Sequence, residues 1–219
     1  MLILAIEGAL ARCSAAIWSD GTILAEASRD AARGQAALLP PLVAEVLARA
    51  EVAATALDAV AVGVGPGGFT GLRAALSLAE GLAAAAGVPL VGVTTGEALV
   101  AALPAAQGRQ RAVWSVIDNK RGSIVLECFA PGSATPEGQP QILALDALPR
   151  PPGPVAIVGD AAAGVAARLA ARDLDAMLTD ARLPEASALA VIAAARLAGA
   201  LPPRDATPLY AEPPAVRGA

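Results

Sequence analysis

The sequence predicts an α/β fold made of two related lobes, and three observations support this prediction. Short apolar runs typical of strands alternate with longer segments whose apolar residues recur at helical spacing. A glycine turn, Gly65-Pro66-Gly67-Gly68, joins one apolar strand directly to a long helix. A strand that ends in an acid and turns into a second strand occurs near Glu7 and again near Asp118. We therefore divide the chain into an N-terminal lobe, residues 1–103, and a smaller C-terminal lobe, residues 104–219.

The first half of the chain predicts a run of three strands, a helix and then two strand–helix pairs. In order, these are strands at 2–6, 13–18 and 23–27, a helix at 35–50, a strand at 59–64, a helix at 70–86, a strand at 90–93 and a helix at 95–103. Thr70 is expected to cap its helix through its hydroxyl, and a threonine also precedes the last helix. Pro40 and Pro41 must bend the first helix or lie in its first turn, because proline lacks the amide hydrogen that a helix interior uses.

The second half predicts a similar pair of opening strands followed by shorter elements. The expected elements are strands at 112–117, 123–129 and 155–158, and helices at 161–171 and 185–198. A stretch rich in proline and glycine covers 131–154, and a proline-rich tail covers 202–219.

The two hairpins that open the halves resemble each other. Leu2–Glu7 followed by Cys13–Trp18 parallels Val113–Asp118 followed by Ile124–Phe129. In both pairs an apolar strand ends in a carboxylate and a turn leads to a second strand. Duplicated hairpins of this kind are the arrangement of the actin-like ATPase fold, in which the paired turns face a nucleotide from both sides. The repeat therefore favours that fold.

The composition excludes several classes of function. Of the 219 residues, 56% are hydrophobic and 16% are charged, and the net charge is −4. Because neutralising phosphates takes clustered Lys and Arg, we expect any contact with nucleic acid to be indirect or shared with a basic partner. No uninterrupted apolar run is long enough to predict a membrane-spanning helix, and the start Met1–Glu7 is typical of a strand rather than a signal peptide. These observations favour a cytoplasmic protein that does not contact a membrane.

The chain has no histidine, which excludes histidine metal sites, serine or cysteine triads and histidine general bases together. Cys13 and Cys128 lie in apolar strand-like segments without a nearby ligand set, so we expect buried thiols and no metal site. No nucleophile is paired with a base in the sequence, so no catalytic residue is predicted.

The glycine turn leaves two interpretations open. A strand, a glycine turn and a helix N-terminus can cradle a phosphate. The turn nevertheless lacks both the dinucleotide fingerprint G-x-G-x-x-G and the Gly-Lys-Ser/Thr of a P-loop. The alternative is a tight strand-to-helix turn with no ligand.

The stretch Gly65-Pro66-Gly67-Gly68-Phe69-Thr70-Gly71-Leu72-Arg73 and the apolar helix after it closely resemble the TsaB (YeaZ) family of bacterial tRNA-modification proteins. That family usually has a serine where this chain has Gly68. The resemblance implies an actin-like ATPase (ribonuclease H-like) fold. It also implies a non-catalytic scaffold that binds TsaD as a heterodimer and, with TsaE, serves the formation of threonylcarbamoyladenosine beside the anticodon of tRNAs that read codons starting with A. Without TsaD, a homodimer is expected.

The resemblance also implies a nucleotide site that has lost its donors. Its residues are expected to be Glu7, Gly65, Gly67, Gly68 and Asp118. Gly8-Ala9 stands where the family usually has Asp-Thr-Ser, so the first turn carries no side-chain donor. We therefore expect no cofactor, with ATP or ADP bound only weakly or in the partner complex. Asp160 either ends a further strand near this cleft or caps a helix.

The helices at 35–50 and 70–86 are apolar over more of their circumference than one packing face requires. Either both are sandwiched within the monomer, or their second faces bind a partner. The resemblance favours TsaD on this surface, with Leu76→Glu expected to block binding and leave a folded monomer. The expected contact residues are Leu38, Leu39, Leu42, Val46, Phe69, Leu72, Arg73, Leu76 and Glu80.

Two alternatives to the scaffold remain open. The first is a small actin-like ATPase or phosphotransferase that uses Glu7, Asp118 and the glycine turn, which requires saturable binding of Mg-ATP by the isolated protein. The second is a homodimeric protein with a different partner.

Overall fold

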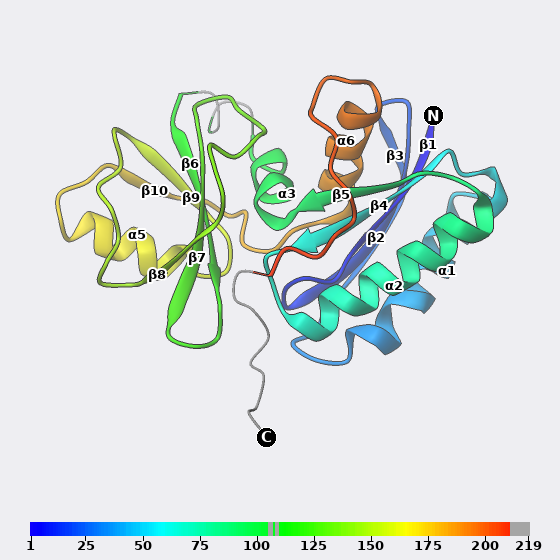
Figure 1. Ribbon diagram of the computed structural model, residues 1–219, viewed down its shortest axis with the longest axis horizontal. Coiled ribbons are helices and arrows are strands. Elements are labelled where there is room, and N and C mark those ends of the chain that lie inside the picture. The colour runs from blue at the N-terminus through cyan, green and yellow to red at the C-terminus, as the bar shows by residue number, and fades with distance from the viewer. Residues whose placement is uncertain (105–106, 108–109, 211–219) are drawn as a thin grey trace.

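The computed structural model describes residues 1–104, 107 and 110–210 of the protein. Two sheets lie side by side, each with helices packed on it, and together they form two lobes (Figure 1). The predicted C-terminal tail is described only as far as Tyr210, and its remainder lies outside the described residues.

The sheet of the N-terminal lobe has the strand order β3-β2-β1-β4-β5. Its hairpin strands β1, β2 and β3 are antiparallel, whereas β4 and β5 run parallel to β1. The bounds are β1 Leu2–Glu7, β2 Arg12–Ser19, β3 Thr22–Asp30, β4 Ala59–Gly65 and β5 Leu90–Thr94.

The sheet of the C-terminal lobe repeats this topology. Its order is β10-β9-β6-β7-β8, with β6–β7 and β7–β8 antiparallel and β6–β9 and β9–β10 parallel. The strand β6 therefore takes the place of β1, and β7 that of β2, which is the correspondence that the sequence repeat predicts. The bounds are β6 Ala112–Asp118, β7 Ser123–Phe129, β8 Gln141–Ala144, β9 Val155–Val158 and β10 Ala176–Leu178.

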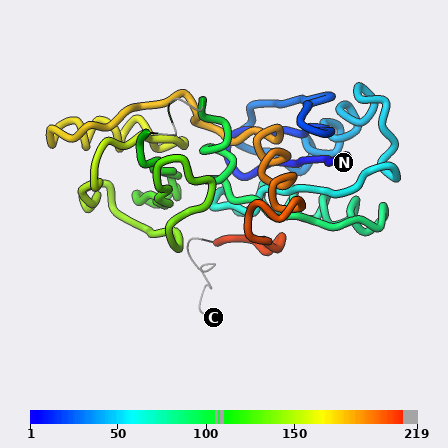
Figure 2. Tube along the Cα trace, turned by 90° about the horizontal axis from the view of Figure 1, so that it is seen from above, coloured from blue at the N-terminus to red at the C-terminus, as the bar shows by residue number. Residues whose placement is uncertain are grey.

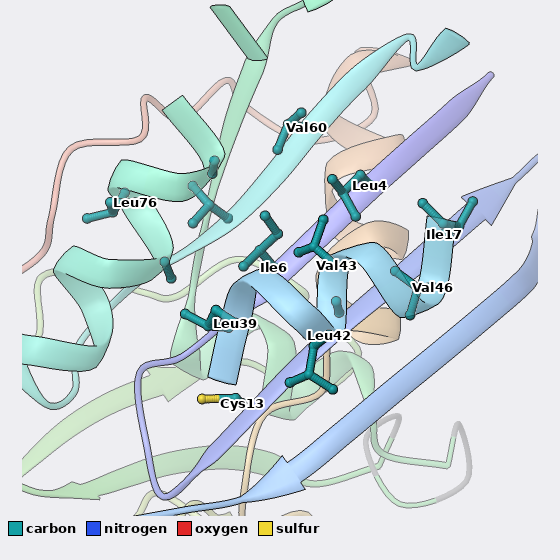
Figure 3. Close-up of a cluster of buried hydrophobic side chains, with 14 of the residues drawn as sticks. Leu4, Ile6, Cys13, Ile17, Leu39, Leu42, Val43, Val46, Val60 and Leu76 are labelled. Atoms are coloured by element: carbon teal, nitrogen blue, oxygen red, sulfur yellow. The ribbon is translucent and has the colours of Figure 1, made fainter. Parts of the chain in front are cut away.

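Helices cover both faces of the N-terminal sheet. Successive side chains of β1 point to opposite faces of the sheet. Leu4 and Ile6 pack under α1 and α2 (Figure 3), whereas Ile3 and Ala5 pack under α6 on the other face.

Helices also pack on both faces of the C-terminal sheet. The helix α5 covers the face that carries Trp114 and Val116, and α3 packs on the opposite face, where Leu99 joins the cluster of Val113 and Phe129. The helix bounds are α1 Gln35–Arg49, η1 Ala54–Ala56, α2 Phe69–Ala86, α3 Thr95–Ala101, α5 Ala162–Ala170 and α6 Ala186–Leu197.

The last helix corrects the predicted division of the chain. The sequence assigns residues 104–219 to the C-terminal lobe, but α6 packs on β1 and β2 of the N-terminal sheet (Figure 2). Small side chains make this contact close, because the buried alanines of α6 meet Ala5, Ala16 and Ala61 in one cluster. The chain thus crosses between the lobes twice, after α3 and before α6.

The helix starts follow the sequence only in part. The helix α2 begins at Phe69 after Gly68, which makes no side-chain cap, so Thr70 lies in the first turn and is not the cap. Thr94 does cap α3, in a capping box in which its side chain accepts from the Glu97 amide while Glu97 accepts from the Thr94 amide. Pro40 and Pro41 lie within α1 and are exposed to solvent.

No helix in the described part of the chain combines the length and the apolar character needed to cross a bilayer.

Replacing Leu76 with glutamate is expected to unfold the protein, which reverses the sequence-based expectation of a folded monomer. Leu76 is 5% exposed and belongs to the core between α2 and the sheet. An unpaired charge in such a core costs about 3–5 kcal/mol of unfolding free energy. Urea unfolding followed by circular dichroism measures the loss. Ser77→Glu, at the exposed neighbouring position, is the matched control and should retain stability. A Leu76→Glu protein as stable as this control would contradict the core placement.

Candidate functional site

Glu7 ends β1 and is completely buried on the face of the sheet that α6 covers. Its Oε1 accepts a hydrogen bond from the Ala9 amide at 2.5 Å, whereas its Oε2 is buried without a hydrogen-bond partner among the described residues. Burial raises the pKa of Glu7 to about 7, against the opposing effect of the Ala9 and Gly8 amides. The carboxyl group is therefore a buried acid that solvent does not reach.

The glycine turn packs against the first hairpin. The Gly68 amide donates to the Ala9 carbonyl at 2.6 Å. A Cβ atom at Gly67 would collide with the same carbonyl, so this position requires glycine for close backbone approach. The backbone of the hairpin thus packs against one side of the turn, whose Gly67 and Gly68 are exposed to solvent on the other side. This geometry favours the tight strand-to-helix turn over a phosphate cradle.

Asp118 ends β6 in the other lobe, where Lys120 neutralises it. Its Oδ1 accepts from the Lys120 amide at 2.7 Å, and its Oδ2 lies 2.9 Å from the Lys120 ammonium. Partial burial acts to raise the pKa of Asp118, but the hydrogen bonds from Lys120 outweigh it and the pKa is lowered.

Asp160 is the third member of this charged group. Of its two predicted positions, the structure supports the one just after the end of a strand, β9, rather than the cap of a helix. Its Oδ1 accepts from the Asp118 amide at 2.8 Å, and its Oδ2 lies 3.3 Å from the Lys120 ammonium. The N-cap of α5 is Ala161, so Asp160 does not cap that helix. The Lys120 ammonium contacts both carboxylates and balances part of their negative charge. The described residues contain no group of three or more acids or cysteines arranged to hold a metal ion.

The five residues predicted for a nucleotide site therefore divide between the lobes. Glu7 and the glycines of the turn lie together in the N-terminal lobe, whereas Asp118 makes its contacts with Lys120 and Asp160 in the C-terminal lobe. Asp118, Lys120 and Asp160 line a cavity of about 550 Å³ beside α5.

A second cavity, of about 420 Å³, lies where both crossings between the lobes meet β2 and α6. Arg12, Arg182 and Glu185 contribute charged groups to its wall. Arg12 pairs with Glu185 and, at 2.6 Å, with Asp30. Sequence reasoning missed this cluster, because no local pattern signals a contact between residues 12 and 185.

The predicted partner residues fall into two groups, and the larger group is a correction. Five of them have side chains at most 5% exposed and belong to the core of the protein itself, namely Leu39, Leu42, Val46, Leu72 and Leu76 (Figure 3). The two helices pack on each other as well as on the sheet, so the second apolar face of each is satisfied within the monomer. These five leucine and valine side chains are unavailable to a partner.

The remaining predicted residues are accessible. Phe69, Arg73 and Glu80 are exposed, and Leu38 is half-buried. Around them, the solvent side of the two helices consists mostly of small residues. We call this surface the outer face of α1 and α2, and its exposed members are Ala36, Ala37, Pro40, Pro41, Ala44, Ala48, Phe69, Arg73, Ser77, Glu80, Gly81 and Ala84.

An aromatic and guanidinium cluster marks the N-terminal end of α2. Phe69 is 45% exposed, and the Arg73 guanidinium carbon lies 3.9 Å from the centre of its ring. The Arg73 Nε donates to the Tyr210 hydroxyl at 3.0 Å, and the Phe69 and Tyr210 ring centres are 5.5 Å apart. Sequence reasoning missed Tyr210, which is remote from α2 in the chain.

Comparisons with known proteins agree with this structure. The family described as "TsaD: tRNA N6-adenosine threonylcarbamoyltransferase" matches residues 27–128. The chain is 40% identical over 95 residues to the tRNA threonylcarbamoyladenosine biosynthesis protein TsaB of Escherichia coli, a match that covers 43% of this chain and 41% of that protein. The matched segment thus spans less than half the length of this curated relative.

The similarity to solved structures extends over the whole fold. The structure of YeaZ from Pseudomonas aeruginosa matches with a TM-score of 0.79 and 27% identity, covering 95% of this chain and 100% of that one. The activator of the 2-hydroxyisocaproyl-CoA dehydratase from Clostridium difficile, solved with bound ADPNP, matches with a TM-score of 0.53 and 10% identity, covering 91% of this chain and 97% of that one. This second likeness concerns the fold alone, and the predicted actin-like ATPase fold is confirmed.

Glu7→Gln is expected to weaken the pH dependence of stability. Because the folded-state pKa of Glu7 is raised from 4.5 to about 7, the folded protein holds this proton more tightly than the unfolded chain does. Stability contributed by the protonated acid is therefore present below pH 4.5 and is lost as the pH rises to about 7. Glu127, whose pKa burial also raises to about 7, adds to the same slope.

Urea unfolding between pH 4.5 and 8 measures the effect. Glu7→Gln should reduce the fall in stability, and the double variant with Glu127→Gln should abolish most of it. Glu80→Gln, at an exposed position on α2, serves as the control. An unchanged slope in the double variant would refute the assignment.

Proposed function

We propose that this chain, which belongs to the TsaB (YeaZ) family, serves the formation of tRNA threonylcarbamoyladenosine as a non-catalytic partner of the transferase TsaD. The observation that carries the proposal is the match to YeaZ over nearly the whole chain, together with 40% identity to the E. coli TsaB over 95 residues. TsaE is the further component, and the tRNA is contacted only indirectly, in the cytoplasm.

The chemistry of the two turns supports a non-catalytic role. Glu7 is buried and shielded from solvent, the hairpin backbone packs against the glycine turn at Ala9, and Lys120 contacts both Asp118 and Asp160. A nucleotide phosphate and its cation need donors and free carboxylates at these positions. The described residues offer neither arrangement.

The outer face of α1 and α2 is the surface proposed for TsaD. Exposed alanines, prolines and glycine let a second helix layer approach closely, and the half-buried Leu38 and exposed Phe69 supply apolar anchors. The TsaD family match at residues 27–128 covers both helices, which supports the pairing of related lobes through equivalent helices. In the absence of TsaD, the same face would join two copies of this chain.

The substitution Ala44→Arg is expected to weaken TsaD binding by about tenfold or more, which corresponds to a loss of about 1.4 kcal/mol of binding free energy. Ala44 is exposed at the middle of α1, so the long side chain would hold the two helix layers apart while the fold stays intact. Light scattering and calorimetric titration with the TsaD of the same organism measure the complex.

Ala167→Arg on α5, an exposed alanine of the other lobe, is the matched control and should bind within about twofold of the parent protein. Equal binding by the Ala44→Arg and Ala167→Arg variants would move the interface elsewhere. The absence of any complex, even with nucleotide and TsaE added, would favour a homodimeric protein with a different partner.

The isolated protein is expected to hydrolyse no Mg-ATP above background. The physical reason is the lack of free carboxylates and phosphate donors at the two turns. A phosphate-release assay compares the parent protein with Asp118→Ala, and both should give the same baseline. Turnover that Asp118→Ala removes would instead support a small actin-like ATPase or phosphotransferase.

A further inference from the structure

The chain after α6 returns across the N-terminal lobe as a surface segment. Residues 201–210, here called the C-terminal strap, run past the edge of β5 and the end of β4 to the first turn of α2 (Figure 1). The strap forms no helix or strand of its own.

Two backbone hydrogen bonds fix the strap to the sheet. The Gly92 amide of the edge strand β5 donates to the Arg204 carbonyl at 3.1 Å. The Leu209 amide donates to the Val64 carbonyl at 2.7 Å. A Cβ atom at position 92 would collide with the Asp205 carbonyl, so β5 is shaped to receive the strap.

An ion pair between Arg204 and Glu97 holds the middle of the strap. The Arg204 Nε lies 3.8 Å from the Glu97 Oε2, too far for a hydrogen bond, and it is buried without a hydrogen-bond partner among the described residues. The closer partner of Glu97 is Arg196. Glu127, whose Oε2 is also buried and unpaired, feels the Arg204 charge. The middle of the strap is therefore held by the attraction between the Arg204 charge and these carboxylates, without a direct hydrogen bond from its Nε.

The strap is only partly buried, with Leu201 and Ala206 packed against the edges of the two core clusters of the N-terminal lobe. None of residues 201–210 is fully buried. Segments with few buried contacts and few backbone hydrogen bonds open locally at much lower free energy than the core of the same protein. Release of the strap therefore does not require the lobe to unfold.

The far end of the strap rests on part of the outer face of α1 and α2. Tyr210 packs on Phe69 and accepts a hydrogen bond from Arg73. We propose that the C-terminal strap is a releasable cover, which occupies the Phe69–Arg73 end of the outer face and must leave before a protein partner can fill it. The competition with TsaD rests on the function proposed above, whereas the release of the strap is a property of the isolated chain.

Hydrogen exchange on the full-length protein tests the release. The Gly92 and Leu209 amides should exchange faster than those of β1. Arg204→Ala should speed both exchange rates about tenfold, which corresponds to a loss of about 1.4 kcal/mol in the free energy of opening the strap. Arg150→Ala, an exposed arginine before β9, should leave both rates unchanged. Exchange of Gly92 and Leu209 only at the rate of β1 would overturn the proposal.

Titration with TsaD tests the competition. The double variant Arg204→Ala/Tyr210→Ala should bind more tightly than the parent protein, by a factor equal to the reciprocal of the open fraction that exchange reports for the parent. Unchanged or weaker binding would overturn the competition. If the parent protein binds no TsaD at all, the proposed function fails, and the exchange rates alone decide whether the strap opens.

Discussion

The buried ion pair between Glu97 and Arg196 joins more of this structure than any other polar contact described above. Both side chains are at most 3% exposed, and the carboxylate and guanidinium meet at 2.5 Å. Arg196 also donates to the carbonyls of Gly92 and Pro202, and Glu97 accepts from the Thr94 amide. One pair thus connects α3, α6, β5 and the start of the C-terminal strap. Such a pair is tolerable in a protein interior only when its remaining hydrogen-bonding groups are also satisfied, as they are here.

The two lobes share one topology, and each sheet has helices packed on both of its faces. The turns that would face a nucleotide in an active member of the fold are contacted by the hairpin backbone in one lobe and by the Lys120 ammonium in the other. The small-residue outer face of α1 and α2 is the surface that we propose for interaction with a partner.

The sequence repeat predicted the two opening hairpins, which β1–β2 and β6–β7 confirm, because strand alternation and turn residues are local properties. The short strands β8 and β10 were not predicted. The glycine turn was also recognisable, although its ligand-free packing depends on contact with Ala9. The partner surface was misassigned at Leu39, Leu42 and Val46, since a wide apolar face does not reveal whether it meets a neighbouring helix or a second protein. The Arg12–Glu185 pair and the position of Tyr210 depend on contacts between remote segments, which no single-sequence pattern contains.

The return of α6 to the first sheet has a consequence for the synthesis of the protein. The side of β1 that carries Ile3 and Ala5 is covered by residues 186–197, which leave the ribosome near the end of translation. Most domains complete their fold in the order in which they are made. Here the N-terminal lobe is made first and completed last, and until then the growing chain exposes an apolar sheet face. Premature termination anywhere before α6 therefore yields an N-terminal lobe with an uncovered face, a substrate for chaperones and proteases rather than a shortened but usable partner protein.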